Sequence, residues 1–150
     1  MSRRLALTAT TLMVAALAVA PAAHAGPAKS MKGSYKVTLT PDPTLEATGQ
    51  VGDGCQALNP AAVDNHKLTV PGAGTLHVVL DSPDPTGTGN ADWDLWIMDS
   101  DGTTVLDGSH GGSAHEETTD KFKKGQQVTI SVCNLLGGSD GTVTYEFKGK

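Results

Sequence analysis

The sequence predicts an all-β domain: an antiparallel β-sandwich, jelly-roll-like, with about eight strands and one disulfide. Three observations predict this fold class. Apolar residues occupy every second position over short segments, most clearly at Val128, Ile130 and Val132. Clusters rich in Gly, Pro and Asp separate these segments, and no segment of the mature chain has the helical period. Two cysteines, Cys55 and Cys133, supply one candidate bridge.

The first half of the chain contains three segments with strand-like alternation and one further candidate. Residues 35–40 place apolar side chains on one face, and Pro41 ends the run. Residues 44–51 are the further candidate, and 56–65 is expected to be an irregular connection. Residues 66–70 form a short strand that ends at a Pro-Gly pair, and 76–80 follow as a strand with Leu76, Val78 and Leu80 on one face.

The second half continues the pattern. In residues 93–98, Trp93, Leu95 and Ile97 are predicted to face the core, and the Asp-Gly turn at 100–103 returns the chain through 104–106. A glycine-rich loop is expected at 108–114. The last strands are expected at 116–122, 128–132 and 143–147, with a turn at Lys123-Lys124-Gly125 after the first of them.

The N-terminus has the layout of a secretory signal peptide. Arg3 and Arg4 precede an apolar run over 5–20, and alanines stand at the −3 and −1 positions of a cut after Ala25. The sequence therefore predicts a signal peptide over 1–25, a disordered leader over 26–33 and a sandwich domain over 34–150. An uncleaved anchor is the alternative, and the arginine pair leaves the twin-arginine route open beside the general one.

The composition bounds the partners. Loss of Arg3 and Arg4 with the signal leaves nine basic against 16 acidic residues, a formal charge of −7. This balance opposes binding to nucleic acid and, after signal removal, to anionic membranes. We expect a secreted protein of the extracellular or cell-wall space.

In an oxidising compartment Cys55 and Cys133 are expected to form a disulfide. The bridge would close a loop of roughly 80 residues, for which chain entropy predicts about 4 to 5 kcal/mol of stability. Two free thiols or metal ligands are the alternative.

Acidic residues are concentrated on one predicted strand–turn–strand unit. Asp92, Asp94, Asp99 and Asp101, with Asp107 nearby, are candidate ligands for calcium, which binds about six to eight hard oxygens. The alternative is ordinary turn chemistry, in which Asp and Gly are the expected residues.

Trp96 is the candidate binding residue, together with Asp94. Both lie on the strand face opposite Trp93, where an indole beside a carboxylate suits a sugar or a peptide. The alternative is that a loop, such as residues 83–90, covers the ring.

No catalytic residue is assigned. The loop Gly108-Ser109-His110-Gly111-Gly112-Ser113 lacks the G-x-S-x-G elbow of a nucleophilic serine, and His115-Glu116-Glu117-Thr118-Thr119 lacks the second histidine of a zinc-binding H-E-x-x-H helix. An enzyme, such as a hydrolase, would need a concave site that joins His110 or His115 to an acid and a nucleophile.

Four segments resemble the bacterial pre-peptidase C-terminal domain family. The run Asp92-Trp93-Asp94-Leu95-Trp96-Ile97-Met98-Asp99-Ser100-Asp101-Gly102 is similar to its acidic strand and turn. The segments at 71–76, 124–130 and 142–147 resemble its other strands, so that the resemblance covers about residues 64–148. It implies a jelly-roll-like sandwich without catalytic residues of its own, with Asp92 and Asp94 as the motif's acidic pair. This chain lacks a peptidase domain and adds Cys55, Cys133 and the glycine-rich insert.

These observations favour a secreted, non-catalytic binding or accessory module whose ligand is a carbohydrate, an extracellular protein or calcium. The alternative from another class is a structural protein that packs on another exported chain. That alternative predicts a contiguous exposed apolar patch.

Overall fold

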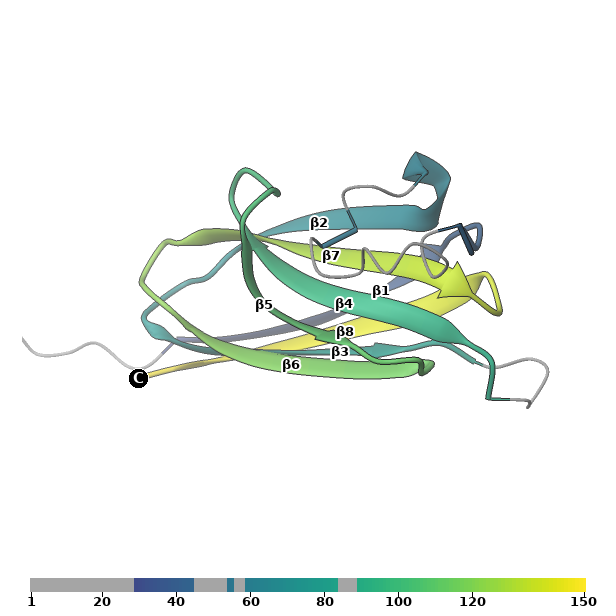
Figure 1. Ribbon diagram of the computed structural model, residues 1–150. Helices are drawn as coiled ribbons and strands as arrows, with labels where there is room; N and C mark the ends of the chain where they lie inside the picture. The colour runs from purple at the N-terminus through teal and green to yellow at the C-terminus, as the bar shows by residue number, and fades with distance from the viewer. Residues whose placement is uncertain (1–28, 45–53, 56–58, 84–88) are drawn as a thin grey trace, which may run out of the picture.

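The computed structural model describes residues 29–44, 54–55, 59–83 and 89–150. Within these ranges eight strands form two antiparallel sheets that stack face to face (Figure 1). The strands are β1 (Ser30–Thr38), β2 (Val63–Thr69), β3 (Gly74–Asp81), β4 (Asp92–Asp99), β5 (Val105–His110), β6 (His115–Phe122), β7 (Gln127–Leu136) and β8 (Asp140–Gly149). A short 3₁₀ turn, η3 (Pro60–Ala62), precedes β2.

The strand order is that of a jelly roll. One sheet has the order β1-β8-β3-β6 and the other β2-β7-β4-β5. The chain crosses between the sheets at almost every connection, and only β4 and β5 follow each other within one sheet as a hairpin. The predicted fold class, with its disulfide between Cys55 and Cys133, is confirmed.

Three expected boundaries need correction. Residues 30–33, expected in the disordered leader, belong to β1, where β8 supplies hydrogen-bonding partners along the whole strand. The apolar alternation is interrupted at Gly33 because a Cβ there would collide with the ring of Tyr145. The connection expected at 56–65 ends earlier, at Val63, and β5 continues to His110 into the expected loop. The signal peptide, residues 1–25, and most of the candidate strand at 44–51 lie outside the described residues.

The core lies between the sheets and follows the predicted alternation. Trp93, Leu95 and Ile97 are fully buried, as are most inward apolar residues of β3, β7 and β8. At the β1–β2 edge the ring of Tyr35 stacks on His66, with ring centroids 4.3 Å apart. Among the described residues, no helix is long and apolar enough to cross a membrane.

Strand β4 is buried on both faces. On its outer face Trp96 and Met98 form a second apolar cluster with Ala62, Cys133 and Leu135. The connection from β1 to β2 reaches this face: a Cβ on Gly54 would lie 3.0 Å from Met98 Cε, and the next residue, Cys55, is disulfide-bonded to Cys133 of β7. The disulfide therefore holds this connection against the outer side of the sheet.

Removal of the disulfide is expected to destabilise the domain strongly. The bridge joins residues 78 positions apart. Chain entropy alone predicts that Cys55→Ala with Cys133→Ala lowers the free energy of unfolding by about 4 to 5 kcal/mol. Urea unfolding measures this loss. A reductant should reproduce it in the parent and have no effect on the variant, and a variant as stable as the parent would contradict the prediction.

Gly108→Ala is expected to disturb the outer cluster. Gly108 faces Trp96 across β4 and β5, and a Cβ there would overlap the indole ring. Overpacking of this kind costs about 1 to 3 kcal/mol. Thermal unfolding and tryptophan fluorescence measure the effect. Gly112→Ala is the matched control, because a Cβ at Gly112 has nothing within 4 Å.

Candidate binding site

The predicted acidic residues of β4 lie far apart along the strand. Asp92 and Asp99 stand at its two ends. At about 3.3 Å per residue they are separated by roughly 23 Å, so the four candidate ligands Asp92, Asp94, Asp99 and Asp101 cannot meet at one ion. In the described part of the chain, no group of three or more His, Cys, Asp or Glu side chains is arranged to hold a metal. The expectation of one calcium site built from all four is thus corrected by strand geometry.

Asp99 and Asp101 are engaged in the β4–β5 turn. Asp101 Oδ1 accepts hydrogen bonds from the Thr103 amide at 2.7 Å and the Thr103 hydroxyl at 2.6 Å. Hydrogen bonding with the Asp99 side chain and with Thr103 lowers the pKa of Asp101 to about 2. Gly102 takes the positive φ, 73°, that the Asp-Gly turn requires. The alternative of turn chemistry accounts for this pair.

Trp96 does not offer an exposed ring, which corrects the expectation of a binding platform there. The Trp96 side chain lies on the predicted face of β4, opposite Trp93, but it is only 4% exposed. The ring stacks on His110, with centroids 5.0 Å apart and planes 12° from parallel. Most of the loop suggested as its cover, residues 84–88, lies outside the described residues. Asp94, on the same face, is 2% exposed.

Burial makes Asp94 the most perturbed carboxyl group of this strand. Desolvation, with the nearby charges of Asp92 and Glu116, raises its pKa to about 7. Among the described residues the ion pairs involve His77, His115 and Lys148, and none reaches Asp94. Asp94 is therefore a buried carboxyl group that changes its protonation state near neutral pH.

The two loop histidines are not joined to a nucleophile. His115 Nδ1 lies 2.6 Å from Asp81 Oδ1, and this hydrogen bond raises the pKa of His115. The hydroxyls of Ser109 and Ser113 both bind the Glu116 carboxylate. Within the described ranges, no serine hydroxyl is hydrogen-bonded to an imidazole nitrogen.

The edge where β5 faces β6 is closed by polar pairs, which we call the carboxylate–hydroxyl seam. Each strand supplies the hydroxyl donor of one pair and the carboxylate acceptor of the other. Ser109 of β5 donates to Glu116 of β6, and Thr118 of β6 donates to Asp107 of β5 at 2.5 Å. Glu116 is only 4% exposed. Hydroxyl donors satisfy these carboxylates, as burial requires.

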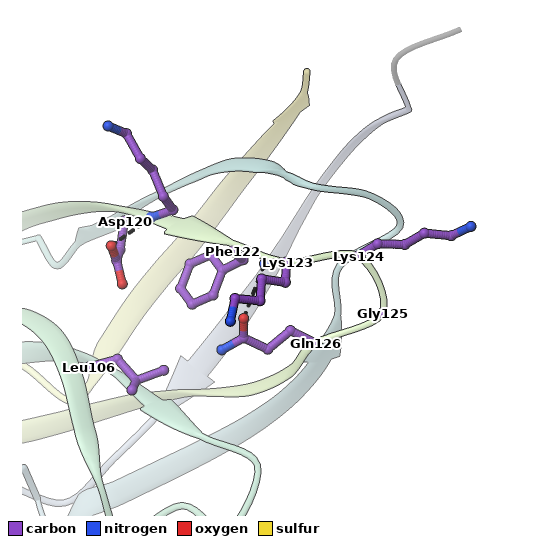
Figure 2. A pocket seen from close by; sticks show the side chains of 8 residues that line it. Leu106, Asp120, Phe122, Lys123, Lys124, Gly125 and Gln126 are labelled. Carbon is purple, nitrogen blue, oxygen red and sulfur yellow. Dashed lines mark hydrogen bonds between the residues drawn. The ribbon is translucent and has the colours of Figure 1, made fainter. Parts of the chain in front are cut away.

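Beyond Thr118 the seam opens into a hollow of about 540 Å³, which we call the edge hollow (Figure 2). Its lining residues are Leu106, Asp120, Lys121, Phe122, Lys123, Lys124, Gly125 and Gln126. Figure 2 shows Leu106 facing the Phe122 ring across the hollow, with the Asp120 carboxylate and the Gln126 amide nearby. Apolar and polar groups thus converge on one open space.

A β-bulge presents Leu106 to the edge hollow. The pairing of β4 with β5 passes from Ile97–Asp107 to Met98–Val105, so Leu106 has no partner on β4. It is 36% exposed, and it is the exposed large hydrophobic residue of the described chain. An irregular strand, rather than chance exposure, therefore directs an apolar side chain into the hollow.

The sequence reasoning missed this site. Leu106 was expected in an ordinary return strand, 116–122 in a plain strand and Lys123-Lys124-Gly125 in a turn. The bulge depends on how β5 pairs with β4, which no local pattern reveals. The lysines at 121, 123 and 124, in a chain with an excess of acidic residues, were the one available signal.

A second, smaller hollow of about 480 Å³ lies on the outer face of the β1-β8-β3-β6 sheet. It is lined by Lys32, Gly33, Ser34, His77, Val79, Thr144, Tyr145 and Glu146. His77 and Glu146 are already in ion pairs, with Glu117 and Lys148. This second hollow provides a control surface for substitutions in the edge hollow.

Asp94 is expected to make stability fall as pH rises from about 4 to about 7. Between these values the unfolded state has released the Asp94 proton and the folded state has kept it, so a rise in pH favours unfolding. A shift of about three pKa units corresponds to at most about 4 kcal/mol. Asp94→Asn should flatten the stability profile in this window, and urea unfolding at a series of pH values measures it.

The parent-minus-variant difference isolates Asp94. Asp101, whose pKa is lowered, stabilises above its unfolded pKa and loses that contribution only below about pH 4. His115, whose pKa is raised, loses its contribution as pH rises above about 6.5, in both proteins. Lys67→Gln, at an exposed residue that forms no ion pair with another described residue, is the control, and an unchanged slope in Asp94→Asn would contradict the assignment.

No family model matches this chain, and no curated protein matches it in sequence. The solved structures that are similar to it include the following two. The pre-peptidase C-terminal domain of a collagenase from Bacillus anthracis is 18% identical, with 82% of this chain and 89% of that chain covered and a TM-score of 0.40. A pentameric capsid protein from metagenomic phage sequences is 14% identical, with 74% and 84% covered and a TM-score of 0.28. At these values family membership stays a prediction.

Proposed function

We propose that this chain is an exported, non-catalytic module that binds carbohydrate in the edge hollow. One observation carries the proposal: Asp120 continues the carboxylate–hydroxyl seam but has no hydroxyl partner among the described residues. Its Oδ1 accepts a hydrogen bond from the adjacent Lys121 amide at 2.6 Å. A hydroxyl from a ligand would complete the series.

The seam itself supports a polyhydroxyl ligand. Glu116, Thr118 and Asp120 are successive inward residues of β6, and the first two are paired with hydroxyl–carboxylate hydrogen bonds to β5. Charge-assisted hydrogen bonds of this type are stronger than neutral ones. The same chemistry, offered by a sugar hydroxyl, fits the position of Asp120.

The apolar side of the edge hollow supports the same class. Leu106 and the Phe122 ring face each other there (Figure 2), and an apolar surface beside polar groups suits the C–H face of a sugar ring. Gln126 Oε1 accepts from the Lys123 amide at 3.1 Å. The amide nitrogen of Gln126 remains a donor that a sugar oxygen can accept from.

Export and the lack of catalysis are supported by separate features. The Cys55–Cys133 disulfide is typical of an oxidising compartment, which agrees with the predicted signal peptide. The His115–Asp81 pair is exposed, and the neighbouring serine hydroxyls are engaged by Glu116. A binding role therefore accounts for these residues without a reaction.

Two substitutions test the site on an array of soluble polysaccharides. Leu106→Ala removes the bulged side chain and is expected to weaken binding by about 1 kcal/mol, or roughly fivefold. Asp120→Ala removes a charged acceptor and is expected to cost about 1.5 to 3 kcal/mol, or roughly ten- to a hundredfold. Isothermal titration with the best-bound polysaccharide measures both.

Val79→Ala is the matched control, because it shortens a half-buried apolar residue of the second hollow. It should leave the affinity unchanged. Thermal unfolding should show that all three variants fold. A parent protein that binds no polysaccharide, or an affinity that only Val79→Ala reduces, would contradict the proposed site.

A further inference from the structure

Lysines are concentrated around the edge hollow. Lys121, Lys123 and Lys124 belong to its lining. Lys148 lies close by, because Thr75 of β3 pairs with Lys121 on one side and with Lys148 on the other. All four lysines are exposed. This concentration stands out in a chain whose net formal charge is −5, and −7 once the signal is removed.

Within the β1-β8-β3-β6 sheet the carboxylates at this end are fewer. On the facing sheet, Asp107 next to Leu106 accepts a hydrogen bond from Thr118, and Asp101 is engaged in the β4–β5 turn. Among the described residues of the β1-β8-β3-β6 sheet, Asp120 lies within the hollow, and Glu146 lies 3.3 Å from Lys148. The opposite end of the same sheet holds Asp81, Glu117 and Asp140 against the single lysine Lys36, with His115 beside Asp81, among the described residues. The sheet is therefore polarised along its strands, with positive charge at the end that carries the hollow.

Alternation along β6 gives the lysines distinct positions. Asp120 and Phe122 point inward, so Lys121 between them projects on the outer face of the sheet, toward the side that carries Lys148. Figure 2 shows Lys124 extending away from the hollow and Lys123 beside Gln126. With neighbouring strands about 4.8 Å apart, Lys121 and Lys148 are roughly 10 Å apart across β3. The positive groups thus flank the hollow and continue beyond it.

We infer that the carbohydrate of the edge hollow is an anionic polysaccharide, a polymer that carries carboxylate or phosphate groups. This inference rests on the proposed sugar site. One sugar unit occupies the space between Leu106 and Phe122, and the negative groups of adjoining units meet Lys121, Lys123 and Lys124. Local positive charge overcomes the repulsion that an acidic domain otherwise exerts on such a polymer, and it steers the polymer to this end.

Matched ligands test the inference. An array presents each carboxylated polysaccharide beside its carboxyl-reduced form, and each phosphate-bearing polysaccharide beside its dephosphorylated form. The anionic form of at least one pair should bind about tenfold more tightly than its neutral form at about 0.05 M salt, and most of this difference should vanish at about 0.5 M. Which pair responds distinguishes carboxylate from phosphate as the source of the charge.

Variants separate charge from sugar recognition. Lys123→Gln with Lys124→Gln should reduce binding of the anionic form about tenfold and reduce that of the neutral form by much less. Lys36→Gln, at the other end of the sheet, is the control and should change neither. Leu106→Ala should weaken both forms.

The outcomes are distinguishable. Equal affinity for the anionic and neutral forms would overturn the anionic class and leave the sugar site standing. Absence of binding to every form would overturn the sugar site itself. Binding of polyphosphate as tight as that of the anionic polysaccharide, with no loss in Leu106→Ala for either, would show charge attraction alone and overturn the inference.

Discussion

Strand β4 is buried on both faces, and most of the architecture depends on this constraint. Its inner face, with Trp93, Leu95 and Ile97, packs between the sheets as in any sandwich. Its outer face carries Trp96 and Met98, which need a second cover. The connection between β1 and β2 reaches this outer face at Gly54. The Cys55–Cys133 disulfide holds the neighbouring residue, Cys55, against β7. Because this face is occupied, Trp96 offers no open surface to a ligand.

The constraint on β4 extends to its neighbour β5. Trp96 lies over Gly108, where any larger residue would displace the ring, and His110 stacks on the same indole. The pairing of β4 with β5 shifts register between Ile97 and Met98, so that Leu106 is the bulged residue. The strand that accommodates Trp96 is therefore also the strand that directs Leu106 into the edge hollow.

The sandwich, its strands and its disulfide were predictable because alternation and turn residues are local signals. The outward side of Trp96 was also predictable, since strand residues alternate strictly. What packs on this outer face was not, because Gly54, Cys55 and Ala62 are distant in sequence and no periodic pattern marks them. The edge hollow was missed for a related reason. Leu106 departs from alternation only through its pairing with β4, and Asp120 is informative only beside the paired carboxylates of the seam.

The carboxylate–hydroxyl seam ends at Asp120, which has no hydroxyl partner among the described residues. This follows from burial, which decreases along β6 from Glu116 to Asp120. Glu116 is nearly inaccessible, so folding requires partners for its carboxylate, and Ser109 and Ser113 supply them. Asp107 and Thr118 pair in the same way one step along. Asp120 is only half-buried, so water can satisfy it and no partner within the protein is needed. A ligand hydroxyl can replace the water at Asp120 at little cost in free energy. A ligand without a hydroxyl would leave the Asp120 carboxylate unpaired. In the proposed sugar site, the same gradient of burial that lets the sandwich fold without a third pair would make Asp120 selective for ligands that carry a hydroxyl.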